Sequence, residues 1–99
     1  MQKIYISQPM NNIEWQEVLD TRQKIIDRIH QSLGNDVEIL NNIFEDYDAS
    51  IALKYQIKAS WLIAEANIVY FAKGWDKSRG CLIEDRFAKA YNKQTVYEN

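Results

Sequence analysis

Few residues of the kinds that cross-link or interrupt a chain are present: one cysteine, one histidine, one proline and three glycines among 99 residues. The single cysteine, Cys81, excludes an intramolecular disulfide framework and a cysteine-rich zinc site. The single histidine, His30, argues against a histidine-based metal cluster, so neither a metal nor another cofactor is expected. With so little proline and glycine there is no linker or low-complexity tract, and residues 1–99 are expected to form a single domain.

Neither sign of charge dominates, because 12 lysines and arginines stand against 14 aspartates and glutamates. Binding a nucleic acid polymer needs a clustered excess of cations, so no such partner is expected. A small nucleotide needs only a few positioned groups and stays possible as a ligand. No apolar run approaches the roughly 18 residues that span a bilayer, and the apolar part of residues 1–7 is too short for a secretory signal. These absences predict no membrane partner and a cytoplasmic location.

Hydrophobic periodicity divides the chain into alternating strands and helices. Short β-branched and aromatic runs predict four strands, over residues 3–6, 37–40, 67–72 and 94–97. Apolar residues at helical spacing predict three helices, over about residues 13–33, about 53–64 and 79–91. The expected apolar face of the middle helix consists of Leu53, Ile57, Trp61 and Ala64.

This βαβαβαβ order predicts an α/β domain in which helices flank a short, mainly parallel four-stranded sheet. The unalternating apolar run at residues 67–72 is typical of a central strand that is covered on both faces. Ligands of such sheets bind beyond the carboxyl ends of the strands, where the strand order reverses. The loops at residues 7–12 and 73–80 belong at that edge, beside the acidic segment at residues 41–50.

The most informative segment is residues 74–84, which follows the central strand and begins the last helix. Free backbone N–H groups and the helix dipole favour an anion such as a phosphate at this point. Ser78 can add a hydroxyl, Arg79 can add charge, and Gly80 allows close approach of the backbone. The alternative is purely structural: Asp76 or Ser78 caps the helix, Gly80 packs it on the sheet, and Arg79 is solvated.

Glu84 is a carboxylate on a helix stripe that should be partly apolar. The residues that share this stripe are Gly80, Phe87, Ala88 and Tyr91. One turn into a helix at the ligand edge, a carboxylate can stay ionised through the helix dipole while it is shielded from bulk water. That state suits a nucleophile at an acetal-like carbon. The alternative is a carboxylate at the rim of the site, paired with Lys77 or Arg79.

Other polar and aromatic residues give weaker signals. By pattern alone, Tyr5 is a core residue. The acidic residues Glu45, Asp46 and Asp48 are most simply a solvated loop, with contact to a base or protonation of a leaving group as the less favoured alternative. Of the three tryptophans, Trp75 alone is placed where it could stack on a base.

Two stretches together resemble a known family. Residues 4–10 read Ile-Tyr-Ile-Ser-Gln-Pro-Met, and residues 74–84 contain Gly-Trp, two residues, Ser-Arg-Gly, three residues and Glu. Both are similar to the nucleoside 2-deoxyribosyltransferase-like superfamily, and closest to its small members from bacteriophages and Gram-positive bacteria. The resemblance implies a three-layer flavodoxin-like (Rossmann-like) fold. It also implies cleavage or transfer at the N-glycosidic bond of a deoxynucleoside or nucleotide in the bacterial or phage-infected cytoplasm.

The same resemblance implies roles for individual residues. Glu84 lies six residues after Ser78 and four after Gly80, as the family's nucleophilic glutamate does after its serine and glycine. Ser78 then contacts the 5′-phosphate, and Tyr5 lies near the nucleophile. The remaining residues of the expected substrate-binding set are Ser7, Arg79, Gly80 and Trp75.

The chain also departs from the family pattern. Lys58 stands where relatives carry an aspartate three residues before the tryptophan of the second helix. Asn67, Asp85 and Asn92 differ from residues that are common in the family. These differences leave two other functions open: a nucleotide-binding protein without turnover, such as a phage protein that sequesters a signal, or an interaction domain with a vestigial ligand edge.

A homodimer or a higher homo-oligomer is expected as well. The chain carries three tryptophans, six tyrosines and three phenylalanines, more than one small sheet readily buries. Members of the family it resembles complete their sites across subunit contacts. The middle helix, with Tyr55 and Trp61, is expected to supply part of the contact, together with Trp15 on the first helix.

Overall fold

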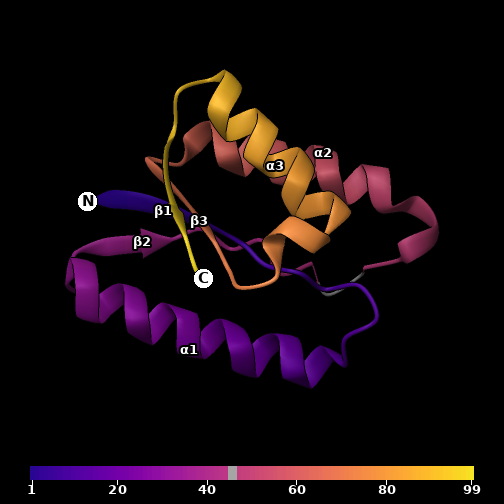
Figure 1. The fold of residues 1–99 in the computed structure, drawn as a ribbon, viewed down its shortest axis with the longest axis horizontal. Coiled ribbons are helices and arrows are strands. Elements are labelled where there is room, and N and C mark those ends of the chain that lie inside the picture. Colours follow the sequence, from indigo (N-terminus) through magenta and orange to yellow (C-terminus); the bar gives the residue numbers. More distant parts are fainter. Residues whose placement is uncertain (45–46) are drawn as a thin grey trace.

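The computed structural model describes residues 1–44 and 47–99, and these residues form three layers (Figure 1). The middle layer is an all-parallel sheet with the strand order β2-β1-β3-β4. Its strands are β1 (Gln2–Ser7), β2 (Val37–Ile39), β3 (Ile68–Phe71) and β4 (Gln94–Tyr97). The α/β class, the parallel sheet and the flavodoxin-like layering are therefore as predicted.

Helices cover both faces of the sheet. Helix α1 (Trp15–Leu33) lies on one face, and α2 (Ala52–Glu65) and α3 (Arg79–Ala90) lie together on the other (Figure 1). The short 3-10 turns η1 (Ala49–Ile51) and η2 (Trp75–Lys77) precede α2 and α3. Among the described residues, no helix has both the length and the apolar character needed to cross a membrane.

Alternation along β1 sends its side chains to the two faces of the sheet in turn. Ile4 and Ile6 belong to the core under α1, together with Ile25 and Ile29 of that helix. Tyr5 belongs to the other core, under α2 and α3. Ser7 has the same parity as Tyr5, so these two side chains of β1 point toward the layer that contains Glu84.

Helix α2 corrects one expectation. Leu53, Ile57 and Trp61 were expected to face the core, yet their exposed fractions are 73%, 53% and 74%. The buried stripe consists instead of residues at the same four-residue spacing on the other side of the helix: Tyr55, Ala59 and Ile63. Two apolar stripes with the same four-residue spacing lie on opposite sides of α2, so spacing alone cannot tell which one faces the sheet. The stripe with Ala59 at its centre does so, because this small residue lets the helix pack in the core that contains Tyr5 and Val69.

Candidate active site

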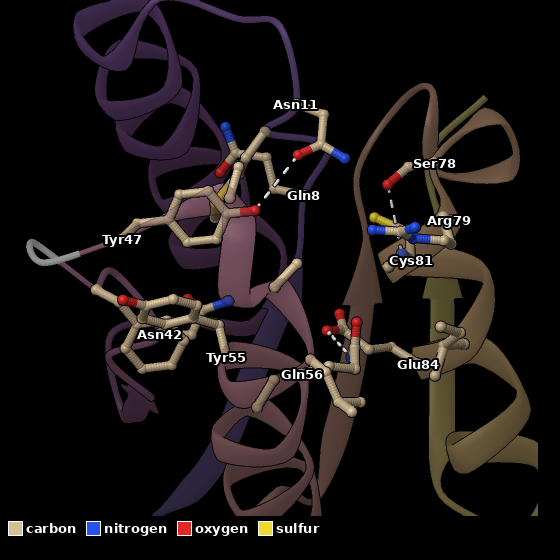
Figure 2. Close-up of a pocket in the computed structure, with 18 of the residues that line it drawn as sticks. Gln8, Asn11, Asn42, Tyr47, Tyr55, Gln56, Ser78, Arg79, Cys81 and Glu84 are labelled. Atoms are coloured by element: carbon tan, nitrogen blue, oxygen red, sulfur yellow. Dashed lines mark hydrogen bonds between the residues drawn. The ribbon is translucent and has the colours of Figure 1, made fainter.

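A cavity of about 550 Å³ lies at the carboxyl ends of the strands, where β1 is flanked by β2 on one side and β3 on the other (Figure 2). The loops after β1 and β2 supply Asn11, Asn42 and Tyr47 to its lining. The beginning of α3 supplies Ser78, Arg79 and Gly80, and Glu84 follows one turn later. The cavity therefore occupies the edge at which the strand order predicts a ligand.

Glu84 is the only acidic residue among the described residues that line this cavity, and its exposed fraction is 8%. Its carboxylate accepts three hydrogen bonds. Ser7 Oγ donates to Oε1 over 2.7 Å, while Tyr5 Oη and Gln56 Nε2 donate to Oε2 over 3.1 Å and 2.8 Å. Strand β1, helix α2 and helix α3 thus meet at one carboxylate.

The electrostatics of this group follow from its burial. Burial raises the pKa of Glu84, and the hydrogen bonds from Ser7, Gln56 and Tyr5 act against that rise. Burial and the neighbouring Glu84 charge raise the pKa of Tyr5 well above its ordinary value, so Tyr5 is a neutral hydrogen-bond donor. Between described residues, ion pairs join Arg28 to Glu98 and Lys89 to Asp85. Glu84 is therefore not the rim carboxylate paired with Lys77 or Arg79 that the sequence left open.

Gln56 is the site residue that the sequence did not reveal. Its side chain reaches Glu84 across the boundary between α2 and α3 (Figure 2). A Cβ atom on Gly80 would lie 3.2 Å from Gln56 Oε1, so the glycine leaves room for this carboxamide. A glutamine on an amphipathic helix has no distinguishing spacing. Only the packing of the two helices brings it to the carboxylate.

Part of the purely structural interpretation of residues 74–84 is confirmed at the beginning of α3. Ser78 is the N-cap of the helix, and its Oγ accepts a hydrogen bond from the Cys81 backbone N–H over 3.4 Å. Ser78 nevertheless lines the cavity, together with Arg79 and Gly80. The helix end with its positive dipole therefore opens into the cavity, next to an exposed guanidinium.

Two expected substrate contacts lie elsewhere. Trp75 packs against Phe71 and Tyr97, with ring centroids 5.4 Å and 4.9 Å apart, and does not line the cavity. The 3-10 turn that contains Trp75 directs the indole back onto the sheet rather than toward the ligand edge. Ser7 is fully buried and donates to Glu84, so it holds the carboxylate in place and is not itself exposed to a substrate.

Across the cavity from Glu84 stand the rings of Tyr47 and Tyr55 (Figure 2). Together with Phe44, which packs against Tyr55 and also lines the cavity, they are here called the aromatic wall. The Tyr47 and Tyr55 centroids are 4.8 Å apart, and the Phe44 and Tyr55 centroids are 5.6 Å apart. Lys58 Nζ lies 5.6 Å from the Phe44 centroid and 5.4 Å from that of Tyr55. A cation thus stands against the aromatic wall at the position where the resembled family carries an aspartate.

Asp48, the acidic residue of this segment that the structure describes, has a structural role. Asp48 Oδ1 accepts hydrogen bonds from the backbone N–H and the hydroxyl of Ser50, and these bonds lower the pKa of Asp48. This carboxylate therefore caps the turn that leads into α2. Glu45 and Asp46 lie outside the described residues.

Neither protein-family models nor curated proteins match this chain. The chemistry of the cavity then follows from its own geometry. Within residues 1–44 and 47–99, no group of three or more histidine, cysteine, aspartate or glutamate side chains could hold a metal ion. A buried carboxylate held by neutral donors, beside a helix N-terminus, can act as a nucleophile or as a general acid or base.

Proposed function

We propose that the protein cleaves the N-glycosidic bond of a (deoxy)nucleoside or its 5′-monophosphate, by hydrolysis or by sugar transfer, with Glu84 as the nucleophile. The observation that carries this proposal is the mostly buried Glu84 carboxylate, held by three neutral donors at the cavity. Neutral donors orient a carboxylate without cancelling its charge, which stays available for attack on an electron-poor carbon. The resemblance of residues 4–10 and 74–84 to nucleoside 2-deoxyribosyltransferase-like proteins supports the same reaction.

The reaction proceeds in two displacements. In the first, the bond between C1′ of the sugar and the base nitrogen breaks, and its electron pair leaves with the base. A carboxylate oxygen of Glu84 bonds to C1′ through an oxocarbenium-like transition state and forms a glycosyl ester. In the second, water or another base attacks C1′ and releases the Glu84 carboxylate, and the proton that the attacking group loses is taken up by the base that left. Tyr5, Ser7 and Gln56 hold the carboxylate in one orientation throughout.

The rest of the cavity suits the other parts of such a substrate. The aromatic wall offers flat apolar surfaces on which a base can stack, across from the nucleophile. The beginning of α3 offers backbone N–H groups and Arg79 to a 5′-phosphate. The order base, sugar and phosphate then runs from the aromatic wall past Glu84 to Ser78.

Lys58 favours a second candidate, a protein that binds a nucleotide without turnover. Its ammonium stands against the aromatic wall, where a carboxylate would be needed to protonate or hold a leaving base. In this second candidate, Glu84 holds a sugar hydroxyl as a hydrogen-bond acceptor.

Incubation of the purified protein with a panel of nucleosides and 5′-monophosphates, followed by chromatography for free base, tests the proposal. We expect the wild type to release base and Glu84→Gln to release none while still binding nucleotide. Asp85→Asn is the matched control. Asp85 is the next residue on α3 and equally buried, but it accepts a hydrogen bond from Tyr97 and pairs with Lys89 away from the cavity.

Undiminished base release by Glu84→Gln would rule out Glu84 as the nucleophile. If the wild type binds nucleotides in calorimetry but releases no base from any of them, the second candidate replaces the first. Intact-mass measurement during turnover adds a direct test, because a glycosyl ester raises the mass of the wild type and leaves that of Glu84→Gln unchanged.

A further inference from the structure

A buried arginine stands behind the site. Arg22, on α1, has an exposed fraction of 8%, and burial lowers the pKa of its guanidinium. Its partners in the described residues are two neutral oxygens: Nη1 donates to Asn42 Oδ1 over 2.7 Å, and Nη2 donates to the Leu40 carbonyl over 3.0 Å. Neither partner carries a negative charge, and a buried guanidinium held only by neutral oxygens is costly, so its position within the described residues calls for an explanation.

The guanidinium is linked to the catalytic carboxylate through two side chains. Asn42 Nδ2 donates to the Ile6 carbonyl over 2.9 Å, and the interaction of the Asn42 side chain with the Tyr5 hydroxyl acts to lower the pKa of Tyr5. Tyr5 in turn donates to Glu84 Oε2. Since Arg22 donates to Oδ1, the amide nitrogen Nδ2 is turned toward strand β1, where it donates to the Ile6 carbonyl next to Tyr5.

We propose that Arg22 is a positioning residue that acts through Asn42 and Tyr5 to keep the Glu84 carboxylate ionised and aimed into the cavity. The cation polarises the Asn42 carboxamide, which makes the Tyr5 hydroxyl a stronger donor to Glu84. The proposal extends the proposed function, because an ionised Glu84 matters most if that residue is the nucleophile.

Ionisation of Glu84 is the property to measure, since burial alone would favour its neutral form. The groups that face Glu84 are Tyr5 and Ser7 from β1, Gln56 from α2 and Cys81 from α3. None of them carries a positive charge. Arg22 is thus the buried cation connected to this group in the described part of the chain.

Titration of the Glu84 carboxyl carbon by 13C NMR tests the proposal without requiring any enzymatic activity, with Glu84→Gln identifying the resonance. In Arg22→Gln we expect the midpoint to rise by about half a pH unit or more, because a cation that favours the carboxylate is lost. Arg22→Lys keeps the charge and should restore a midpoint close to that of the wild type. Arg28→Gln, on the same helix but paired with Glu98, is the control and should change nothing.

The pathway is tested by a double-mutant cycle with Tyr5→Phe, in which the effect of Arg22→Gln should shrink to less than half. An unchanged midpoint in Arg22→Gln, an equal rise in Arg22→Lys, or a full effect in the Tyr5→Phe background would overturn the proposal. If Arg22→Gln does not fold, Arg22→Met replaces it, because methionine keeps an unbranched side chain and removes the charge. Its midpoint should also rise, and an unchanged value would overturn the proposal. Absence of base release from the wild type would count against the proposed function and leave this titration valid.

Discussion

At the scale of single residues, Glu84 combines burial with a full set of hydrogen-bond donors. Burial penalises the carboxylate form, and three donors compensate part of that penalty. Each donor is uncharged in its ordinary state, so the carboxylate keeps its net charge. The properties of the site should therefore respond to the removal of any one donor.

Replacement of Tyr5 by phenylalanine keeps the buried ring and removes one donor. We expect the pKa of Glu84 to rise further and the acid limb of base release to move to higher pH. The free energy of unfolding should fall by about 1 kcal/mol, the usual contribution of one hydrogen bond. Tyr97→Phe, which removes a hydrogen bond to Asp85 away from the cavity, should leave the pH profile in place. The expectation fails if both variants have the profile of the wild type.

The raised pKa of Glu84 also makes stability depend on pH. Between the ordinary value of 4.5 and the raised value, folded molecules hold a proton that unfolded molecules have lost. The unfolding free energy of the wild type should therefore fall as pH rises through this window, relative to Glu84→Gln, which has no such proton. Urea denaturation at a series of pH values measures the difference. Parallel curves for the two proteins would contradict it.

Glu84 could be identified from the sequence alone, and the reason is physical. Glu84 falls on the stripe of α3 that faces inward, and polar groups on such stripes are rare enough to be noticed. The alternation along β1 likewise places Tyr5 and Ser7 on one face. Gln56 and the Arg22–Asn42 contact could not be found this way. The first depends on how α2 packs against α3, and the second on how α1 packs against the loop after β2, and no local pattern encodes either.

At the scale of elements, the site depends on the close contact between α2 and α3. Gly80 lies in the first turn of α3, and the Gln56 carboxamide occupies the space beside it. The first turn of α3 thus begins the helix and also contacts the side chain of Gln56 on α2. Changes there should affect activity and stability differently.

Gly80→Ala should separate these two effects. Alanine favours a helix over glycine by up to about 1 kcal/mol, so we expect no loss of stability. The new Cβ would press on Gln56 Oε1, weaken its bond to Glu84 and reduce base release several-fold. In a Gln56→Ala background the same substitution should have no effect on base release. A reduction of equal size in both backgrounds would show that Gly80 acts on something other than Gln56.

The N-terminus of α3 should prefer a 5′-monophosphate to the bare nucleoside. Charge-assisted hydrogen bonds contribute about 1.5–3 kcal/mol each, so one such bond corresponds to about a tenfold to hundredfold preference. Calorimetry with a nucleoside and its monophosphate measures it. Arg79→Gln should weaken only the monophosphate, whereas Arg86→Gln, exposed further along α3, should weaken neither. Equal affinities of the wild type for both ligands would refute the phosphate contact.

At the scale of the whole molecule, the outward stripe of α2 is the feature that an isolated chain explains least well. The apolar side chains of Leu53, Ile57 and Trp61 lie in a row on the surface, exposed to water. Burying such a row against another molecule would be favourable. Tyr55, which the sequence suggested as a contact residue, packs inside against Phe44 and Tyr47 instead. Any contact through this helix therefore depends on the exposed stripe.

A homodimer that buries this stripe stays our prediction for the protein in solution. Light scattering at micromolar concentration should give about twice the 11.7 kDa mass of one chain. Trp61→Lys should return the mass to that of a single chain, because it places a charge in the apolar contact. Tyr91→Lys, equally exposed but beyond the end of α3, is the control and should not. A wild-type mass near that of one chain would reject the prediction.

The three hydrogen bonds on Glu84 join residues that are 79, 77 and 28 positions apart in the chain. Long loops must close before such contacts form, and local structure alone cannot repay that entropy. No folding intermediate that lacks β1, α2 or α3 can reproduce the environment of this carboxylate. During synthesis on a ribosome, the cavity cannot be completed until the helix that carries Glu84 has emerged, so a chain that stops short of this helix cannot form the site.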